Sequence, residues 1–221
     1  MQVLVIGASR GLGLEFVRQY RAAGDRVTAT ARDDAGLARL RALGARTIAL
    51  DVAVAESCSR LAWQLDGSDF DLVIVNAGVY GAPSSGLQAP AEADFDAVMH
   101  TNVLGAMRAV EACTEVLAPG ATLVLMSSGM GSIGARGAPD RWLYRASKAA
   151  LNSVAKDASL VLAGRASCIA LDPGWVRTDM GGPAAPQAVD AAVADIRRTL
   201  AALTPADNGR YLAYDGRERP W

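Results

Sequence analysis

The 221-residue sequence predicts a doubly wound α/β fold of three layers, in which a parallel sheet lies between two layers of helices. Three observations lead to this prediction. Short runs of apolar and β-branched residues alternate with longer stretches of helical periodicity. The runs are continuous enough to form strands that are buried on both faces. Segments rich in Gly, Pro and Ser follow several of these strands, where open α/β sheets bind their ligands.

The elements alternate in the βαβ order from the first residues onward. Apolar runs predict strands at residues 3–6, 26–31, 46–50, 72–75, 122–126 and 166–171. Helical periodicity predicts helices at residues 11–23, 35–43, 55–65, 92–117, 141–162 and 187–203. Right-handed crossovers should connect the strands. The densest Gly, Pro and Ser punctuation falls at residues 81–90, 127–139 and 173–186.

Length and composition predict one domain over residues 1–221, because the chain is 51% hydrophobic and long enough for one sizeable core. Its 22 basic and 23 acidic residues give a net charge of -1 and are interspersed without blocks. This pattern argues against a nucleic-acid partner or an anionic membrane surface. The sequence therefore favours small molecules as partners.

Cysteine usage and the first apolar run bear on location. Cys58, Cys113 and Cys168 are odd in number and lack Cys-x-x-Cys spacing, which argues against a disulfide framework or a thiolate zinc site. The sole histidine, His100, has no metal-binding or Ser/His/Asp pattern around it. The first apolar run is too short for a signal peptide, and no stretch has membrane-spanning length. We expect a cytoplasmic protein without a metal site.

A glycine-rich turn links the first predicted strand to the first predicted helix. It reads Gly7-Ala8-Ser9-Arg10-Gly11-Leu12-Gly13, and its small residues allow backbone amides to approach a pyrophosphate at a helix N-terminus. A tight turn without a ligand is the alternative. The GxxxGxG spacing differs from the GxGxxG of most two-domain dehydrogenases and resembles the short-chain dehydrogenase/reductase family.

The resemblance continues in order along the chain. It implies a Rossmann fold with a mostly seven-stranded parallel sheet, and a cofactor site built on the positions that match the family. These positions are Gly7, Ser9, Arg10, Gly11, Leu12 and Gly13 in the turn; Arg32; Asp51 and Val52; Asn76, Ala77 and Gly78; Tyr144 and Lys148; and Pro173, Gly174, Val176 and Thr178. The segments 172–180 and 214–221 look most like the small C-factor and sniffer-type carbonyl reductases. Two positions depart from the family pattern, since Ile6 replaces a threonine and Val75 an asparagine.

Tyr144 and Lys148 are the candidate reacting pair. They lie four residues apart on a predicted helix and therefore share a face. A neighbouring ammonium stabilises a phenolate and lowers its pKa, so Tyr144 can serve as the acid in carbonyl reduction. An ordinary surface pair is the alternative, but the chain has only two lysines among its 22 basic residues.

Ser128 and Asn102 complete the catalytic set that the resemblance implies. Ser128 follows the fifth predicted strand and can donate to the substrate oxygen where negative charge develops. The separation from Tyr144 exceeds the family's usual spacing, so Ser127 and Ser132 remain alternatives. Asn102 matches the family's helix asparagine, which implies a water link between Lys148 and solvent.

The residues after the second strand bear on the choice of nicotinamide. An acid at that position favours NAD, because it bonds the ribose hydroxyls and repels an extra phosphate. Here Arg32 follows the strand, and with Arg10 it offers donors for a 2′-phosphate. This favours NADP. Asp33 and Asp34 keep NAD open, since a shift of one residue would restore the NAD pattern.

The sequence therefore predicts an NADP-dependent oxidoreductase acting on a small or medium carbonyl or alcohol. A nicotinamide-nucleotide-binding sensor without catalysis is the alternative, because fold does not fix function. The chain is too short for a sugar-nucleotide epimerase of the extended branch. We expect the substrate pocket to be lined by residues 81–90, 132–141 and 175–186, with a short lid and an apolar wall. Helices 92–117 and 141–162 are expected to form a homodimer or homotetramer.

Overall fold

Seven parallel strands form one sheet in the computed structural model, which describes residues 1–83 and 86–221. Their order across the sheet is β3-β2-β1-β4-β5-β6-β7. The strands are β1 (Gln2–Ile6), β2 (Arg26–Ala31), β3 (Arg46–Ala49), β4 (Phe70–Val75), β5 (Leu117–Met126), β6 (Ser167–Asp172) and β7 (Tyr211–Ala213). The doubly wound fold and the seven-stranded sheet are confirmed. The six predicted runs all form strands, whereas β7 has only three residues and gave no run of its own.

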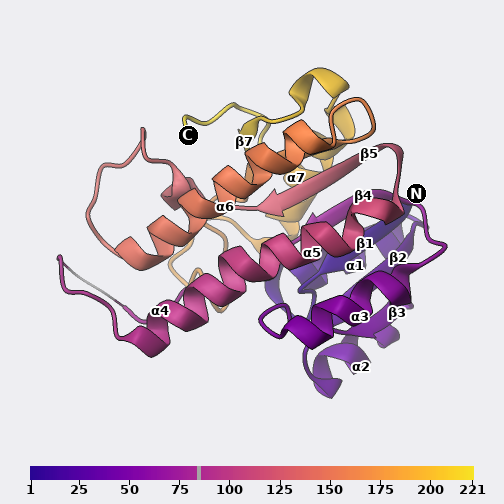
Figure 1. Cartoon of the computed structure of the whole chain (residues 1–221), viewed down its shortest axis with the longest axis horizontal. Helices are drawn as coiled ribbons and strands as arrows, with labels where there is room; N and C mark the ends of the chain where they lie inside the picture. The colour runs from indigo at the N-terminus through magenta and orange to yellow at the C-terminus, as the bar shows by residue number, and fades with distance from the viewer. Residues whose placement is uncertain (84–85) are drawn as a thin grey trace.

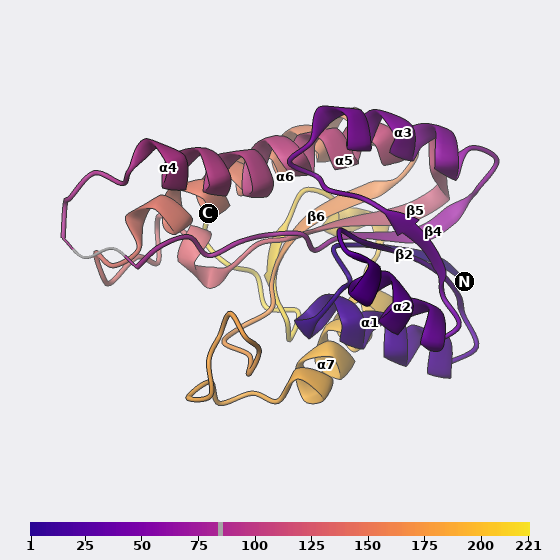
Figure 2. The same ribbon diagram turned by 90° about the horizontal axis from the view of Figure 1, so that it is seen from below.

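Helices cover both faces of the sheet (Figures 1 and 2). One layer contains α1 (Gly11–Ala22), α2 (Asp34–Ala42) and α7 (Val189–Ala202). The opposite layer contains α3 (Ala55–Leu65), α4 (Glu92–Met99), α5 (Gly105–Cys113) and α6 (Trp142–Val161). In the part of the chain that the structure describes, no helix is both long and apolar enough to cross a membrane.

The two layers enclose two hydrophobic cores, one on each side of the sheet. Successive residues of a strand point to opposite faces, so each central strand feeds both cores. Leu123 and Leu125 of β5 pack toward α5 and α6, whereas Val124 and Met126 pack toward α1 and α7. All four side chains are buried. This explains why the sequence shows continuous apolar runs rather than polar alternation.

The predicted helix 92–117 is wrong as a single regular helix. Between α4 and α5 the chain forms a π-helical turn at His100–Leu104, and Leu117 already belongs to β5. Phe70 pairs with Leu117, and the register then shifts before Leu72 pairs with Thr122. Gly120 has a positive φ of 80°, so the Pro-Gly step interrupts the apolar pattern without ending the strand.

The strand order reverses between β1 and β4, which places the segments after β1, β4, β5 and β6 at one edge of the sheet. At this end of the molecule, the segment before α4, residues 129–141 and the segment before α7 extend beyond the helical layers (Figure 2). The candidate site residues therefore meet here.

Candidate active site

The glycine turn after β1 is packed too closely for larger side chains. Gly7 has φ +84°, and a methyl group there would lie 2.6 Å from the backbone of Ala77. A methyl group at Gly13 would lie 2.3 Å from Gly7 O. The Gly7 N–H donates to Thr30 Oγ1 at 3.0 Å, while Asn76 Nδ2 donates to Gly7 O at 2.7 Å. Thr30 of β2 thus holds the turn, although the family's threonine before the first glycine is absent.

The N-terminus of α1 opens from this turn without a side-chain cap. Arg10 occupies the N-cap position, and the first helical turn contains no acidic residue. The first N–H groups of an α-helix have no partner within the helix and favour an anion. Together with the close backbone approach at Gly7, this arrangement fits the pyrophosphate of a dinucleotide.

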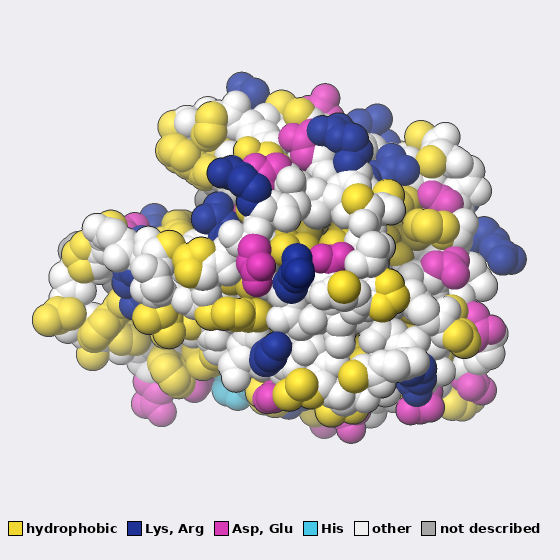
Figure 3. Space-filling view, turned by 90° about the horizontal axis from the view of Figure 1, so that it is seen from above, with side chains coloured by type: hydrophobic (Ala, Val, Ile, Leu, Met, Phe, Trp, Pro, Cys, Tyr) yellow, Lys and Arg dark blue, Asp and Glu magenta, His cyan; other side chains and the backbone are white. Residues whose placement is uncertain are grey.

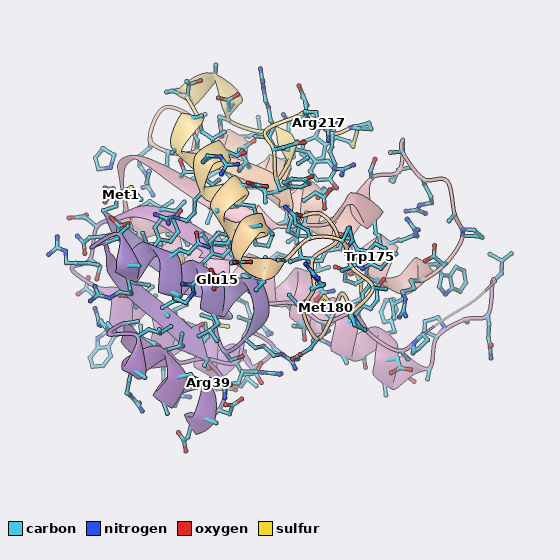
Figure 4. The ribbon with its side chains drawn as sticks, turned by 180° about the vertical axis from the view of Figure 1, so that it is seen from behind. Met1, Glu15, Arg39, Trp175, Met180 and Arg217 are labelled. Carbon is cyan, nitrogen blue, oxygen red and sulfur yellow. The ribbon has the colours of Figure 1, made fainter. Side chains whose placement is uncertain are left out.

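Arginines surround the outer side of the glycine turn. Arg39 of α2 donates through two guanidinium nitrogens to Ser9 O, each at 3.1 Å (Figure 4). Arg10 forms an exposed ion pair with Asp179 at 3.2 Å, and Arg32 is exposed beside α2. The sequence analysis missed Arg39, because its contact with Ser9 crosses 30 positions of the chain and carries no local pattern.

Asp33, the residue that kept NAD open, has a structural contact. Its Oδ1 accepts a hydrogen bond from the Gly36 N–H at 2.6 Å and caps α2. Asp34 is the first residue of that helix. The Asp33 carboxylate therefore stabilises a helix start.

On the other side of the turn, Asp51 and Val52 follow β3. Asp51 Oδ1 accepts from the Ala53 N–H at 3.0 Å. Asp51 is partly exposed. Val52 is buried, and a methyl group at Gly105 would lie 2.8 Å from its side chain. Both residues belong to the cofactor site that the resemblance implies.

Lys148 lies at the centre of the site on α6. Its Nζ donates to Met126 O, at the end of β5, at 2.8 Å, and lies 5.8 Å from the centroid of the Tyr144 ring. Among the described residues, no other acceptor takes its remaining protons. The side chain is 4% exposed, and burial lowers the pKa of Lys148 to about 8.

Tyr144 lies one helical turn before Lys148 and is also buried. Burial raises the pKa of Tyr144, since a phenolate is poorly solvated there, and the Ser128 hydroxyl acts in the opposite direction. Ser128 is partly exposed, and its Oγ accepts from the Met130 N–H at 3.2 Å. The structure thus brings Ser128 and Tyr144 together.

The two alternative serines have partners that direct them elsewhere. Ser127 Oγ donates to Asn152 Oδ1 at 2.5 Å, within the buried interior. Ser132 Oγ donates to Pro220 O at 2.6 Å. This geometry favours Ser128 over both.

Asn102 lies within the π-helical turn and is fully buried. Its Oδ1 accepts from the Val79 N–H at 2.8 Å, while its Nδ2 donates to Val79 O at 2.9 Å and to Ser147 Oγ at 3.0 Å. A methyl group at Gly78 would lie 3.3 Å from Asn102 Oδ1 and 3.5 Å from Lys148 Nζ. Asn102 therefore fixes the segment after β4 beside the lysine.

The segment after β6 faces the glycine turn. Gly174 has φ +78°, and its N–H donates to Asp172 Oδ1 at 3.0 Å. Thr178 Oγ1 accepts from the Gly181 N–H at 3.1 Å. A methyl group added at Gly11 would lie 3.4 Å from the methyl group of Thr178. Pro173 is partly buried, and Val176 is buried in an isolated bridge with residue 187.

Tyr80 and Met130 lie next to Tyr144, and two further large apolar side chains are exposed on the segment before α7. The Tyr80 ring meets that of Tyr144 edge to face at 4.5 Å, and its hydroxyl contacts Met130 Sδ at 3.4 Å. Trp175 and Met180 are 56% and 44% exposed on the segment before α7 (Figure 4). A notch separates two lobes at this end of the molecule (Figure 3). The sequence analysis missed Tyr80, which lies one residue before the expected pocket segment 81–90; Ser84 and Ser85 of that segment lie outside the described residues.

Comparison with known families decides the relationship. The sequence profile of the family described as short chain dehydrogenase matches residues 1–188. The chain belongs to the short-chain dehydrogenase family. Among curated relatives of this chain, C-signal from Myxococcus xanthus is 36% identical over 154 residues, which cover 68% of this chain and 92% of the relative.

Solved structures of carbonyl reductases are also similar to this chain. The carbonyl reductase Sniffer of D. melanogaster aligns with a TM-score of 0.93 and 27% identity, covering 100% of this chain and 99% of the other. The NADPH-bound carbonyl reductase from chicken fatty liver aligns with a TM-score of 0.88 and 29% identity, covering 100% and 98%. The expected likeness to sniffer-type carbonyl reductases is confirmed.

The buried Lys148 predicts a pH-dependent stability. Its pKa is lowered in the folded chain, so unfolding takes up a proton between about pH 8 and its ordinary value of 10.5. The free energy of unfolding should therefore rise with pH across this window. Lys148→Met should lack that part of the rise, roughly 2–3 kcal/mol by the size of the shift. Urea unfolding of the cofactor-free protein at a series of pH values measures the difference.

The matched control is Lys156→Met, which removes the exposed second lysine of the same helix. It should follow the wild-type curve in shape. If Lys148→Met kept the full rise with pH, the lysine would not be held in a desolvated site.

Proposed function

We propose that this chain is an NADP(H)-dependent carbonyl reductase, and that residues 1–221 form one cofactor-binding and catalytic domain. The observation that carries the proposal is the buried Tyr144–Lys148 pair at the carboxyl edge of the sheet, with Ser128 beside it. The bound nicotinamide would supply the hydride that reduces the substrate carbon. The protein then has to bind the oxygen, stabilise its developing charge and donate a proton.

Tyr144 donates that proton in the proposed mechanism. To reduce a carbonyl, Tyr144 must start in its protonated form, and burial favours this neutral phenol. The Ser128 hydroxyl, which its neighbours leave partly exposed, donates to the same oxygen as charge accumulates. Two donors aimed at one oxygen orient the carbonyl and lower the barrier to its reduction.

Lys148 has two functions in this proposal. It would hold the nicotinamide ribose with the protons that Met126 O does not accept, and its charge stabilises the phenolate left after proton transfer. A pKa near 8 allows Lys148 to exchange protons close to neutral pH. Asn102 positions the segment around residues 78 and 79, and we propose that it also anchors a water between Lys148 and solvent.

NADPH is the proposed cofactor, with NAD less favoured. The chicken relative is described as bound to NADPH. In this chain Arg10 and Arg32 lie at the rim of the turn, and Arg39 joins them through Ser9 O. Planar guanidinium groups match phosphate oxygens, so this rim suits a 2′-phosphate.

The substrate class follows from the side chains exposed on the segments after β4, β5 and β6. Tyr80, Met130, Trp175 and Met180 are apolar or aromatic and partly or largely exposed. The segment 173–188 contains no helix that could close tightly over a substrate. We therefore propose small or medium apolar aldehydes and ketones, accepted with modest selectivity.

Two further properties belong to the proposal. Exposed Phe95 and Met107 on α4 and α5, with Leu160 on α6, support self-association through these helices as a homodimer or homotetramer. The three cysteines are buried free thiols, which supports a cytoplasmic location.

The decisive variant for the chemistry is Tyr144→Phe. It removes the proton donor and keeps the ring that packs on Tyr80, so kcat should fall about 10²–10⁴-fold while NADPH still binds. Steady-state kinetics with a panel of apolar carbonyls, and a fluorescence titration with NADPH, give the two readouts. The control is Tyr20→Phe, which changes a buried tyrosine of α1 away from the site. Undiminished turnover in Tyr144→Phe would reject the mechanism.

Arg32→Ala tests the choice of cofactor. Losing a charge-assisted contact to the 2′-phosphate should weaken NADPH binding about 10- to 100-fold and leave NADH binding unchanged. Arg41→Ala removes an exposed arginine of α2 and serves as the control for charge. Equal wild-type affinities for NADPH and NADH would contradict the assignment.

A further inference from the structure

Residues 217–221, here named the tail, fold back from β7 toward the segment that carries Ser128. The Arg219 N–H donates to Tyr211 O at 2.8 Å, and Glu218 forms an antiparallel bridge with Leu212. The tail therefore runs beside β7 and ends near residues 129–141 (Figure 1).

Three hydrogen bonds join the tail to the loop that follows the candidate serine. Ser132 Oγ donates to Pro220 O at 2.6 Å. The N–H groups of Ile133 and Gly134 both donate to Trp221 O, at 3.1 and 2.9 Å. The loop is thus held at successive residues by a segment almost 90 positions further along the chain.

Tyr211 supports the serine itself from the side away from the notch. Its hydroxyl donates to Ser128 O, and its fully buried ring lies 5.4 Å from the ring of Trp221. On the other side, a methyl group at Gly131 would lie 3.0 Å from the backbone of Lys148. The serine segment is therefore enclosed between α6 and the β7–tail region.

An ion pair lies beneath this segment, and its two contacting atoms are buried although the Arg219 side chain is 32% exposed. Arg219 Nε is 2.5 Å from Asp172 Oδ2, and the Asp172 side chain is 3% exposed. Apart from this contact, neither atom has a hydrogen-bond partner among the described residues. A methyl group at Gly129 would lie 3.1 Å from Asp172 Oδ2, so the backbone after Ser128 rests on the pair.

We propose that Arg219 is a positioning residue for the reaction: it holds the Ser128 segment against α6 and neutralises Asp172 beside Tyr144. The inference rests on the proposed function, because Ser128 and Tyr144 receive their roles there. Removing one partner of a buried pair leaves an uncompensated charge, and the loop above it loses its support. Errors of about 1 Å in the placement of a reacting group are enough to slow catalysis strongly.

The charge of Arg219 also bears on the pH profile. The groups facing Tyr144 are Lys148 on α6, Ser128 after β5, Tyr80 after β4, Asp172 on β6 and Tyr211 on β7. Of these, Tyr80, Asp172 and Tyr211 raise the pKa of Tyr144, and Arg219 is the counterion of Asp172. Without the guanidinium the pKa of Tyr144 should rise further. The decline of kcat at high pH, which follows the deprotonation of Tyr144, should then move to higher pH.

The test compares Arg219→Met with Arg217→Met. Arg217 belongs to the same tail but pairs only with exposed Asp215, at 2.7 Å (Figure 4). In Arg219→Met, we expect kcat for NADPH-dependent reduction to fall about tenfold or more. The decline of kcat at high pH should move to higher pH, and the affinity for NADPH should be retained. Hydrogen exchange should become faster at residues 128–135 and stay unchanged in β1 and α1. Arg217→Met should match wild type, and Arg219→Lys should recover most of the loss.

Hydrogen exchange needs no activity, so it separates this inference from the proposed function. Unchanged exchange at residues 128–135 in Arg219→Met would overturn the inference, as would equal kinetic losses in Arg217→Met. If Arg219→Met does not fold, Ser132→Ala, which removes the contact with Pro220 O and the acceptor of the Ala135 N–H, should show the same gain in exchange at residues 128–134 and a smaller loss of kcat. Wild-type exchange and kinetics in Ser132→Ala would also overturn the inference.

Discussion

The contact between the Lys148 ammonium and Met126 O joins the helix that carries the candidate reacting pair to the strand that leads to Ser128. Met126 ends the central strand β5, and Lys148 lies in the middle of α6. A buried ammonium is costly unless it is bound, so this carbonyl, together with the buried face of α6, stabilises the placement of α6 against the sheet. With α6 so placed, Tyr144 faces Ser128 one turn earlier. The proposed acid and the proposed oxygen-binding donor therefore lie beside one hydrogen bond in the core.

Close backbone packing forms the other half of the site. Gly7, Gly13 and Gly78 lie where β1, α1 and the segment after β4 meet, and a methyl group at any of them would press on its neighbours. The same closeness brings backbone N–H groups to the edge of the sheet without side chains in the way. Positive charge comes from the arginines of the glycine turn and of α2, which lie outside this closely packed region.

The sequence was sufficient for the fold and for the residues that act through local spacing. The strands are buried on both faces, so their apolar runs are visible, and Tyr144 and Lys148 share a face because of helical periodicity. Contacts between distant segments left no such pattern. Arg39 on Ser9 O, Tyr80 on Tyr144 and Arg219 on Asp172 are pairings that only the folded chain reveals. The Pro-Gly step in β5 likewise interrupts the apolar pattern near the start of this strand. Only the pairing with β4 shows that the strand continues through the step.

The most direct test of the central claim follows the hydride. Wild-type protein would be incubated with NADPH that carries deuterium at the transferable position of the nicotinamide, together with a panel of apolar aldehydes and ketones. The account predicts alcohols with deuterium on the former carbonyl carbon, detected by mass spectrometry. Tight NADPH binding without a deuterated alcohol from any carbonyl would contradict it, and would favour a nucleotide-binding protein that performs no reduction.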